Sequence, residues 1–568
     1  MSSFNGASRR SFLKYSAATG TGLLFGSSAM ATPSGAPANP ANFGIMFPTL
    51  RGKPFAHPDD TVRRALLEIG KRGGIMDVNE DLTAGAKRLA LDPAVNGTPT
   101  ALDTFGKNPF NPTNTQGTTF FGQLIDHDIT FDQTSILGAP ANPLLSRNVQ
   151  SAALDLDTVF GKGPTVSPAL YVSAKGSVGP KMKVGSGGVY EYYPYTTNPD
   201  GTPKLIMADP GRNNAVMQLE GLVLAYILAY NRVLEDLPHL DLQHLPAARQ
   251  FKKPATALEH HQVAREVITW HYHWLIVNEF LPQIVGQSLV DNVLQNGNRY
   301  YNPPTGNAFM PIEFGSAAFR YGHSQVDPSY LTNFSSGTGA SNNPDKAPFW
   351  GLTFDPSTPT PQFNQDNTFD RPDMLGGFPA KRRYIGWQTY FDFGDGHVMH
   401  NRKIKPALSS TLLTLPVPAI APGTEKAPIS LAQRNLLRQL TWAMPSGQTL
   451  AKEIGATPLS KADLDLIGSV YAPFATETPL WYYVLAEAKV AANGTTLGPV
   501  GGLIVAETLI GLLRSNPNSY LNKQPDFKPF LGSDLKIQNR TTSIAGSRDY
   551  GTANLLYYAN VVKPGIYR

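Results

Sequence analysis

The sequence predicts a mainly α protein, in which one large helical domain is connected by long irregular loops. The first observation is the spacing of apolar residues, which recur every three or four positions and so mark one face of a helix. Four segments show this pattern, at about residues 211–236, 258–287, 428–442 and 499–514. The second observation is that the 52 glycines and 48 prolines gather between helical segments, chiefly in residues 92–118, 176–211 and 335–380. Because the candidate motifs fall on both sides of every such loop, we expect one domain.

The strongest helical pattern begins at about residue 211, and we expect this helix to be central. Asp209 suits the residue that caps a helix, and Pro210 suits the first helical position. A broad apolar stripe follows, made of Leu219, Leu222, Val223, Tyr226, Ile227, Tyr230 and Val233. Arg212 would then lie in the first turn, where the helix dipole disfavours a cation. This position indicates either a function for Arg212 or a solvated helix end.

The first residues have the pattern of an export signal. Ser8-Arg-Arg-Ser-Phe-Leu-Lys14 is typical of a twin-arginine signal, and Ala29-Met-Ala31 fits a cleavage site after a weakly apolar run. We therefore expect residues 1–31 to be a signal peptide for the twin-arginine export machinery, and residues 32–568 to act in the periplasm or as a secreted protein. A basic disordered N-terminus is the alternative. No other segment reaches the roughly 18 uninterrupted apolar residues of a membrane helix, so no transmembrane segment is predicted.

Charge and cysteine content exclude several classes of protein. Removal of residues 1–31 takes away three basic residues and no acidic one, so the formal charge falls from +5 to +2. This charge is too small to indicate binding to nucleic acid. The absence of cysteine excludes disulfides, zinc–thiolate sites, iron–sulfur clusters and thiolate-ligated haem. Several histidines lack the spacing or the acidic partners of known motifs and are interpreted as structural: His260, His261, His271, His273, His397 and His400.

The segment Phe121-Gly-Gln-Leu-Ile-Asp-His-Asp-Ile-Thr130 carries the most informative group of polar residues. If it is a helix, Gln123 and His127 share one face and Asp126 lies one step round it. Asp128 points away from that face. Polar groups in such an apolar frame are costly unless each has a partner. The plainer alternative is a helix-end histidine beside two solvated aspartates.

Gly122-Gln-Leu-Ile-Asp-His-Asp128 resembles the distal-histidine motif of the animal-type haem peroxidases. The resemblance implies haem b as the cofactor and His127 as the general base and acid, with Gln123 ordering water or small anions in the pocket. Arg212-Asn-Asn-Ala-Val-Met-Gln-Leu219 is similar to the catalytic-arginine helix of the family. Arg212 then takes the catalytic position.

Two later segments resemble the proximal side of the same family. Ala317-Ala-Phe-Arg-Tyr-Gly-His-Ser324 resembles the proximal motif, which implies that His323 is the axial ligand of the haem iron. Leu431-Ala-Gln-Arg-Asn-Leu-Leu-Arg438 resembles the segment whose asparagine holds the proximal imidazole. Asn435 would accept the proton on the ring nitrogen that faces away from iron. Two arginines are expected beside the haem propionates, Arg320 and Arg438. In the plainer interpretation this helix only presents a polar face.

Ser151-Ala-Ala-Leu-Asp-Leu-Asp-Thr-Val-Phe-Gly161 resembles the calcium loop of the family. The implied Ca²⁺ ligands are the hydroxyl and carbonyl of Ser151, the carbonyl of Ala153, and the carboxylates of Asp128, Asp155 and Asp157. A hard cation with several oxygen ligands fits Ca²⁺. The family usually has threonine and serine at the positions of Ser151 and Asp157, and the extra carboxylate should keep or strengthen the site. Alternating acids on an exposed turn are the alternative.

Departures from the family limit what the resemblance implies. Asp126 matches the first residue that forms an ester with haem in mammalian members. The glutamate position of the second ester is Ala215, and the position of the methionine link is Val216. We therefore expect one ester link at most, through Asp126, and no strong oxidation of chloride. The radical tyrosine of the fatty-acid-oxygenating relatives corresponds to Arg320, and Tyr321 does not match that position.

The resemblance covers roughly residues 40–568. It implies a haem peroxidase that reduces hydrogen peroxide and oxidises small donors such as phenols, iodide or bromide, as part of a response to oxidative stress. A haem-dependent fatty-acid dioxygenase is the alternative within the enzymes. An exported scaffold or binding protein that has lost haem is the alternative outside them, and the haem absorbance spectrum separates it from the other two.

Overall fold

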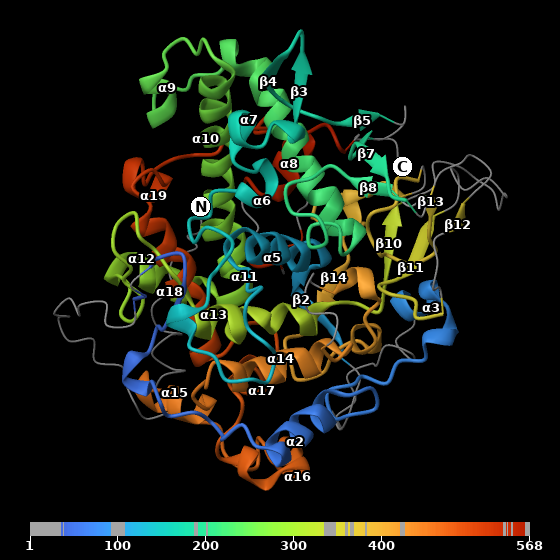
Figure 1. Cartoon of the computed structure of the whole chain (residues 1–568), viewed down its shortest axis with the longest axis vertical. Helices are drawn as coiled ribbons and strands as arrows, with labels where there is room; N and C mark the ends of the chain where they lie inside the picture. The colour runs from blue at the N-terminus through green and yellow to red at the C-terminus, as the bar shows by residue number, and fades with distance from the viewer. Residues whose placement is uncertain are drawn as a thin grey trace, which may run out of the picture.

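Helices form the body of the protein, and short strands lie toward its edges (Figure 1). The computed structural model describes residues 36–37, 39–91, 108–186, 191–199, 201, 203–333, 348–357, 362–363, 369–380, 383–420, 427–537, 541, 544–546 and 549–562. The longer helices are α2 (Asp60–Gly70), α5 (Gln116–Ile129), α8 (Met217–Asp236), α10 (Ala257–Leu275), α12 (Gln287–Asn296), α14 (Leu431–Thr441), α17 (Leu480–Ala492) and α18 (Pro499–Ser515). The shorter helices are α3 (Ala86–Leu91), α6 (Asp157–Phe160), α7 (Gly163–Val166), α9 (Pro246–Gln250), α11 (Leu281–Val285), α13 (Ile312–Ser316), α15 (Gly447–Glu453), α16 (Asp465–Val470), α19 (Tyr520–Lys523) and α20 (Thr552–Tyr558). The mainly α, single-domain fold predicted from the sequence is confirmed.

The strands pair only in twos. The antiparallel pairs are β2 (Phe110–Thr115) with β14 (His400–Arg402), β3 (Tyr171–Ala174) with β4 (Ser177–Met182), β5 (Gly185–Ser186) with β6 (Glu191–Tyr192), β7 (Tyr195–Thr197) with β8 (Pro203–Leu205), β10 (Ser329–Asn333) with β11 (Phe349–Leu352), and β12 (Gln362–Phe363) with β13 (Phe369–Asp370). β1 (Phe43–Gly44) pairs in parallel with β9 (Met310–Pro311). Several of these strands lie in segments predicted as loops. Strands this short carry no strong sequence pattern, because an alternation of apolar and polar residues is recognisable only over about four to eight residues.

The core lies around α8, which packs against α5 on one side and α10 on another. Residues 480–488 of α17 and most residues of α18 are buried as well, and these two helices pack together. A helix that is apolar all round belongs in the interior, since no face of it gains from water. The apolar stripe predicted on α8 is buried throughout, from Leu219 to Val233.

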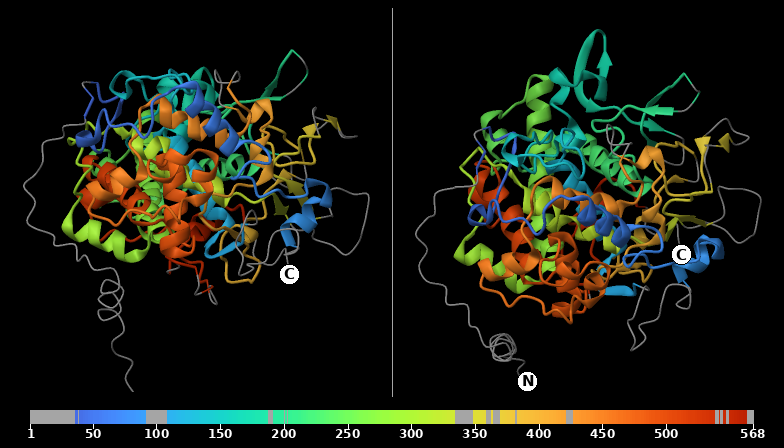
Figure 2. Two further views of the ribbon diagram at one scale, coloured as in Figure 1. Left: turned by 90° about the horizontal axis from the view of Figure 1, so that it is seen from below. Right: turned by 60° about the horizontal axis from the view of Figure 1, so that its bottom comes forward.

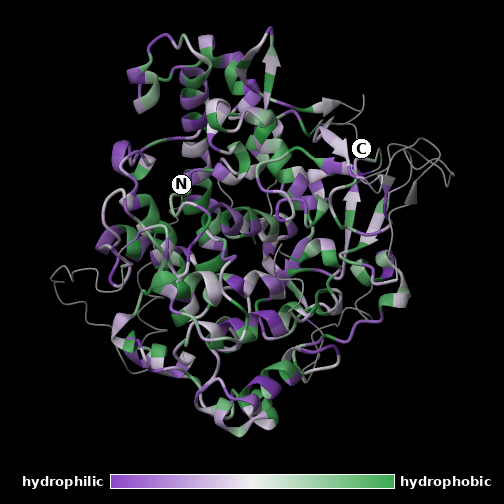
Figure 3. Cartoon of the chain, in the orientation of Figure 1, coloured by the Kyte–Doolittle hydropathy of each residue, from purple (hydrophilic) through white to green (hydrophobic). Residues whose placement is uncertain are grey.

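The outer helix α2 shows the opposite pattern. It carries both purple and green residues in Figure 3, and its buried positions recur every three or four residues, as Val62, Ala65, Leu66 and Ile69. This spacing marks one apolar face. That face packs against α14, far along the chain, and Figures 1 and 2 both show α2 beside the helices of residues 431–492. Among the described residues, no helix is both long and apolar enough to cross a membrane.

One predicted helix boundary is wrong. The helix expected from residue 211 begins at Met217, so Arg212 lies in the turn before it. The reason is tertiary, since Val216 forms a β-bridge with Leu375 instead of a helical turn. The helix expected over 258–287 continues from α10 through a π-helical turn, η6 (Ile276–Phe280), into α11 and ends at Gly286, whose φ is +82°. The predictions for α14 and α18 are confirmed to within a few residues.

Candidate functional site

The predicted site residues meet at one cavity of about 270 Å³ between α5, α14 and the 3₁₀ segment η7 (Ala318–Gln325). The predicted residues that line it are Gln123, Asp126, His127, Arg212, Arg320, His323, Asn435 and Arg438. These residues come from four separate stretches of the chain. The cavity therefore brings together both groups of residues that the motifs indicated. None of the predicted calcium ligands lines it.

Helix α5 holds the first group. Its start is fixed by a capping box, in which Thr115 and Thr118 bond to each other's backbone N–H groups. Gly122 allows a close approach in the middle of the helix, because a Cβ there would lie 3.1 Å from the ring of Phe280. The last turn is fixed by Thr130, whose hydroxyl donates to a carboxylate oxygen of Asp126 at 2.8 Å. Asp126 thus keeps one oxygen engaged while it lines the cavity.

His127 is buried, and one of its two ring nitrogens is engaged. Its Nδ1 lies 3.0 Å from Oδ1 of Asn213. Nε2 has no hydrogen-bond partner among the described residues. Burial and the nearby Arg212 guanidinium hold the pKa of His127 well below its usual value, although the bond to Asn213 raises it. The imidazole is therefore neutral and has a free basic nitrogen.

Arg212 is buried beside the end of α5. Its Nη2 donates to the carbonyl of Thr130 at 2.7 Å, and its Nη1 donates to Asp209 at 3.0 Å. The guanidinium lies 4.3 Å from the centroid of the Phe131 ring. Burial raises the pKa of Asp209, and Arg212 lowers it in turn. Asp209 is thus the counter-ion of Arg212. The prediction that Asp209 caps α8 is wrong, because this helix begins at Met217.

His323 lies across the cavity on η7, and its Nδ1 is 2.7 Å from Nδ2 of Asn435. The predicted pair is present, but the amide has the opposite orientation to the one predicted. An amide nitrogen only donates, so Asn435 does not accept a proton from the ring in this arrangement. The reason is Arg320, whose Nη1 donates to Oδ1 of Asn435 at 3.2 Å. Burial, and then Arg320, lower the pKa of His323 to about 3.

The two arginines expected beside the propionates differ in how far they are already paired. Nη1 of Arg438 donates to Asp132 at 2.6 Å, and the guanidinium lies 5.4 Å from the ring centroid of Trp442. Arg320 also donates to the carbonyl of Gly315, at 3.0 Å. Burial and the neighbouring Arg438 lower the pKa of Arg320 to about 10, which still leaves it charged at neutral pH.

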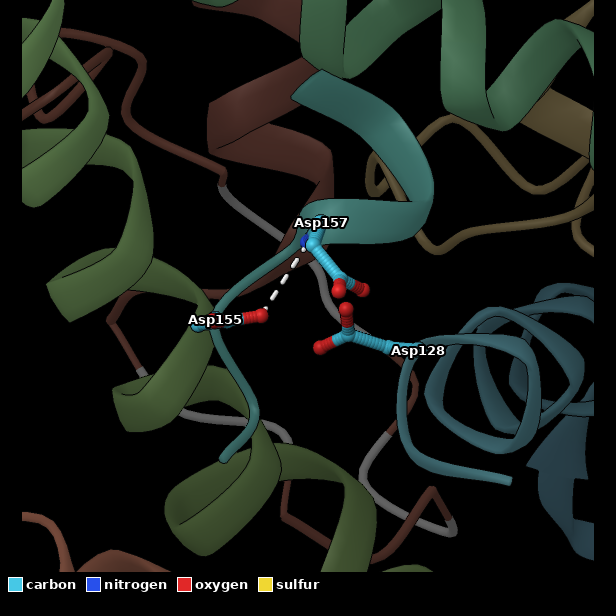
Figure 4. Close-up of side chains that lie close together, drawn as sticks. All are labelled: Asp128, Asp155 and Asp157. Carbon is cyan, nitrogen blue, oxygen red and sulfur yellow. Dashed lines mark hydrogen bonds between the residues drawn. The ribbon is translucent and has the colours of Figure 1, made fainter. Parts of the chain in front are cut away.

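Outside the cavity, three aspartates converge on one point (Figure 4). One carboxylate oxygen from each of Asp128, Asp155 and Asp157 lies within 4.8 Å of the others. Figure 4 shows the carboxylates of Asp128 and Asp157 facing each other, from α5 and α6. Burial, and then the two other aspartates, hold the pKa of Asp128 well above its usual value. The same causes, burial and then Asp155, raise the pKa of Asp157 to about 6, so this cluster of acids needs a compensating charge.

Two cations lie at the rim of this aspartate cluster. Nζ of Lys162 is 3.0 Å from Asp157, and Nη2 of Arg265 is 3.3 Å from Asp155. The hydroxyl of Ser151 donates to Asp155 at 2.9 Å. Ala153, the other predicted ligand, lies half-buried in the same loop.

The backbone of this loop is strained on both sides of Asp155. Leu154 has a φ of +52° and Leu156 a φ of +58°, which are left-handed values that branched side chains rarely adopt. Both leucines are fully buried, and the carbonyl of Leu154 accepts a bond from His273 at 2.8 Å. Strain of this kind persists where the surroundings impose it, and it often marks a binding site.

The residues present fit both groups that the resemblance implies. The cavity has apolar walls suited to a flat ring system and arginines at its edge suited to carboxylates. Its apolar walls include Phe43, Phe131, Val216, Phe319, Phe354 and Leu415. At the aspartate cluster, one oxygen of Asp128 and one of Asp157 are buried without any hydrogen-bond partner. Buried unpaired carboxylate oxygens that face each other fit a cation.

Several site residues were not found from the sequence. Asn213 directly follows Arg212, but no spacing rule relates it to His127. Asp132 and Asp209 were not recognised as the partners of the cavity arginines. Arg434 also lines the cavity and donates to the carbonyl of Pro428 at 3.2 Å. Its place one helical turn before Arg438 is the signal that could have found it.

Comparison with known proteins agrees with this geometry. A model of the animal haem peroxidase family matches residues 138–375. Mouse thyroid peroxidase is 28% identical over 236 residues, which cover 38% of this chain and 24% of that protein. The structure of peroxidase A from Dictyostelium discoideum aligns over 93% of this chain and 99% of that one, with a TM-score of 0.53 and 13% identity. Residues 138–375 are thus similar to the animal haem peroxidase family, and the chain as a whole has the fold of peroxidase A.

Two further proteins show how far the likeness extends. Chorion peroxidase of Aedes aegypti is 27% identical over 187 residues, or 31% of this chain and 21% of that protein. The matched region of this chain thus spans only about a quarter of the length of the curated relatives. A fatty acid alpha-dioxygenase of Arabidopsis thaliana also has this fold, with a TM-score of 0.51 and 11% identity over 93% of this chain and 81% of that one. The fold alone does not separate the two activities.

The family match includes Arg212, His323 and the loop of the aspartate cluster, but it excludes His127 and Asn435. The structure relates these two residues to the rest of the site, because they line the same cavity.

Proposed function

We propose that this protein is a haem-dependent peroxidase that reduces hydrogen peroxide and oxidises small donors. One observation carries the proposal: His127 and His323 line the same cavity, and each has Nδ1 engaged and Nε2 without a partner among the described residues. Haem, when bound between them, supplies the iron that holds peroxide and the electrons that reduce it. His323 is the proposed iron ligand, and His127 lies on the side where peroxide reacts.

His127 acts as the base and then as the acid. Because the pKa of His127 is held low, its imidazole is neutral and Nε2 is free to take the proton from the peroxide oxygen that would lie nearer to iron. The same nitrogen then gives this proton to the departing oxygen, which leaves as water. General acid–base catalysis of this kind contributes roughly 100- to 10,000-fold to a rate.

Arg212 stabilises the negative charge that builds on the departing oxygen. Its guanidinium is already held by the carbonyl of Thr130 and by Asp209, so it needs little rearrangement during the reaction. Gln123 lines the same cavity and is proposed to order peroxide or water there.

On the other side, Asn435 orients the imidazole of His323, and Arg320 and Arg438 hold the propionates of the cofactor. Arg438 meets this role with the donors that remain beside its bond to Asp132.

The aspartate cluster is the proposed Ca²⁺ site. Asp128 directly follows His127 on α5, so an ion that joins Asp128 to Asp155 and Asp157 also fixes the helix that carries the base. Ser151 and the carbonyl of Ala153 would complete the oxygen ligands.

Donor preference follows from how the cofactor is attached. Ala215 and Val216 both line the cavity, and neither side chain can form a covalent link to haem. Asp126 has a free carboxylate oxygen there, so one ester at most is proposed, formed during turnover with peroxide. Fewer links make the iron less oxidising, which favours phenols, iodide or bromide over chloride. The twin-arginine export proposed from residues 1–31, and the periplasmic or secreted location, concern residues outside the described part of the chain.

The test is haem binding and its spectrum. The full chain, produced with added haem, should show a Soret band and oxidise a phenol with hydrogen peroxide. His323→Gly should lose the band and regain it when free imidazole is supplied, since imidazole can replace the missing ligand. A wild-type chain that binds no haem would support the scaffold alternative. Oxygenation of a fatty acid without peroxidase activity would support the dioxygenase, and a normal spectrum in His323→Gly would reject the site assignment.

A further inference from the structure

A buried asparagine determines which nitrogen of His127 carries the proton. Oδ1 of Asn213 lies 3.0 Å from Nδ1 of His127. An amide oxygen has no proton and can only accept, so the proton of the neutral ring must be on Nδ1. The lone pair is then on Nε2, the nitrogen without a partner, on a side chain that lines the cavity.

The orientation of the Asn213 amide is itself fixed by its other end. Nδ2 of Asn213 lies 2.8 Å from the carbonyl oxygen of Thr158 and 3.0 Å from its hydroxyl oxygen. A carbonyl oxygen only accepts, so the NH₂ group must face it and Oδ1 must face His127. Asn213 is fully buried, and turning its amide would set Oδ1 against the carbonyl oxygen of Thr158, two acceptors without a proton between them.

We propose that Asn213 is a positioning residue for His127, which keeps the proton on Nδ1 and so keeps Nε2 available as the base. This inference rests on the proposed function, in which Nε2 takes the proton of the peroxide. Asn213 does not line the cavity and reaches the reacting atoms only through His127. Without it, either ring nitrogen could carry the proton, and the fraction of molecules with a basic Nε2 would fall.

Thr158, the residue that fixes the amide of Asn213, belongs to a different part of the fold. Thr158 is the second residue of the short helix α6, directly after Asp157 of the aspartate cluster. The position of the acceptor for His127 therefore depends on α6 and not on α5. The neighbouring Asn214 has a separate task, because its Oδ1 accepts from the backbone N–H of Gly211 at 2.6 Å and closes the turn.

The first test reads the proton directly and needs no haem. The full haem-free chain is labelled with ¹⁵N-histidine, and the signal of His127 among the 11 histidines is identified by its loss in His127→Gln. The ¹⁵N shifts distinguish a protonated ring nitrogen from a bare one. We expect a protonated Nδ1 and a bare Nε2 in the wild-type chain. A proton on Nε2 in the wild-type chain would overturn the proposal without any variant.

Variants then separate positioning from general stability. Asn213→Ala should shift the proton wholly or partly to Nε2, whereas Asn213→Asp should keep Nδ1 protonated, because a carboxylate oxygen also accepts. Asn231→Ala is the matched control, since Asn231 is a buried asparagine bonded through both ends of its amide to the backbone of Met182, outside the cavity. It should leave the His127 signals unchanged. An unchanged Nδ1 proton in Asn213→Ala, or its loss in Asn213→Asp, would contradict the proposal.

The haem-loaded chain supplies the second readout. Asn213→Ala should lower the rate constant for the reaction with hydrogen peroxide by about tenfold or more, as a part of the roughly 100-fold or greater contribution of general acid–base catalysis. The KM for a phenolic donor should not change, and Asn231→Ala should react at the wild-type rate. If the wild-type chain fails to react with peroxide, the proposed function fails while the proton assignment still stands. If the wild-type chain reacts and Asn213→Ala reacts equally fast, the positioning role fails.

Discussion

The two sides of the cavity hold their histidines in different ways. His127 lies on a regular helix, and the amide that meets its Nδ1 is fixed with the oxygen toward the ring by two acceptors on Thr158. His323 lies on a 3₁₀ segment, and the amide of Asn435 turns its nitrogen toward the ring because Arg320 occupies its oxygen. The position of the ring proton is thus determined by neutral groups on His127 and by a neighbouring cation on His323.

This difference shows how the same pair of side chains can serve two chemistries. On the His127 side, the bare Nε2 is ready to accept a proton. On the His323 side, Nδ1 accepts in the present arrangement, so the ring carries its proton on Nε2. In the proposed function His323 binds iron through a bare Nε2, so haem binding would require its proton to move to Nδ1 and the amide of Asn435 to turn. The His127 side would thus be arranged before haem binds, and the His323 side would rearrange as haem binds.

The largest contrast is expected from removing each histidine. His127→Gln should keep haem but react with peroxide roughly 100- to 10,000-fold more slowly, because the acid–base group is lost. His323→Ala should lose haem, because the protein's only bond to iron is lost. Absorbance spectra and stopped-flow mixing with peroxide measure the two effects. If His127→Gln loses haem and His323→Ala keeps it, the two sides have been assigned in reverse.

Removal of each asparagine should affect haem binding as removal of the histidine on the same side does. Asn435→Ala should weaken haem binding by about 10- to 100-fold, the usual cost of removing a partner of a metal-bound histidine. Asn213→Ala should leave haem affinity close to that of the wild type, since it acts on the other imidazole. Titration of the haem-free chains with haem measures both. Equal losses of affinity in the two variants would show that the sides are not independent.

Removal of the cation should affect the His127 side of the cavity and not the His323 side. A chelator, or Asp128→Ala, should lower both the unfolding temperature and the rate with peroxide, because an ion that binds only the folded state stabilises it. The stabilisation is about 2.7 kcal/mol when the free ion is at roughly 100 times its Kd. Thermal unfolding with and without chelator measures it, and Asp526→Ala, an exposed acid outside the cluster, is the control. An unchanged unfolding temperature in both cases would mean that the aspartate cluster binds no ion.

The effect of the cation should depend on pH. Burial raises the folded-state pKa of Asp157 to about 6 from 3.8, and that of Asp128 well above 3.8. An acid with a raised pKa favours the folded state while it is protonated, so without the cation stability is lost as pH rises through about 6. A bound cation offsets this loss. The rise in unfolding temperature caused by Ca²⁺ should therefore grow as pH passes about 6, and Asp157→Asn should flatten this dependence. An equal rise below and above that pH would reject the explanation.

The smallest effect concerns attachment of haem on the His127 side. After treatment with peroxide, the denatured chain should carry the mass of one haem at most, and Asp126→Ala should remove that mass. An adduct that survives in Asp126→Ala would place the bond on another residue. Rapid oxidation of chloride near neutral pH would show that the iron is made strongly oxidising by contacts other than covalent links.

Sequence patterns were enough to predict the mainly α class, the helices around residues 431–441 and 499–515, and eight of the residues that line the cavity. The helices follow from local spacing, and the eight site residues from the resemblance of short motifs to those of the animal-type haem peroxidases. Helical periodicity repeats within a few turns, and a motif such as Gly122-Gln-Leu-Ile-Asp-His-Asp128 already places its polar groups on defined faces of one helix.

Which groups meet depends on how distant segments pack. Residues 211–216 were predicted to be helical, but they form a turn in which Arg212 pairs with Asp209 and Asn213 joins His127 to Thr158. The orientation of the Asn435 amide likewise follows from Arg320. Hydrogen bonds between distant segments depend on how helices pack, and a buried polar group accepts whatever partner that packing brings within reach. Local spacing carries no record of such partners, and for this reason the sequence located the two histidines but not the contacts that set their protons.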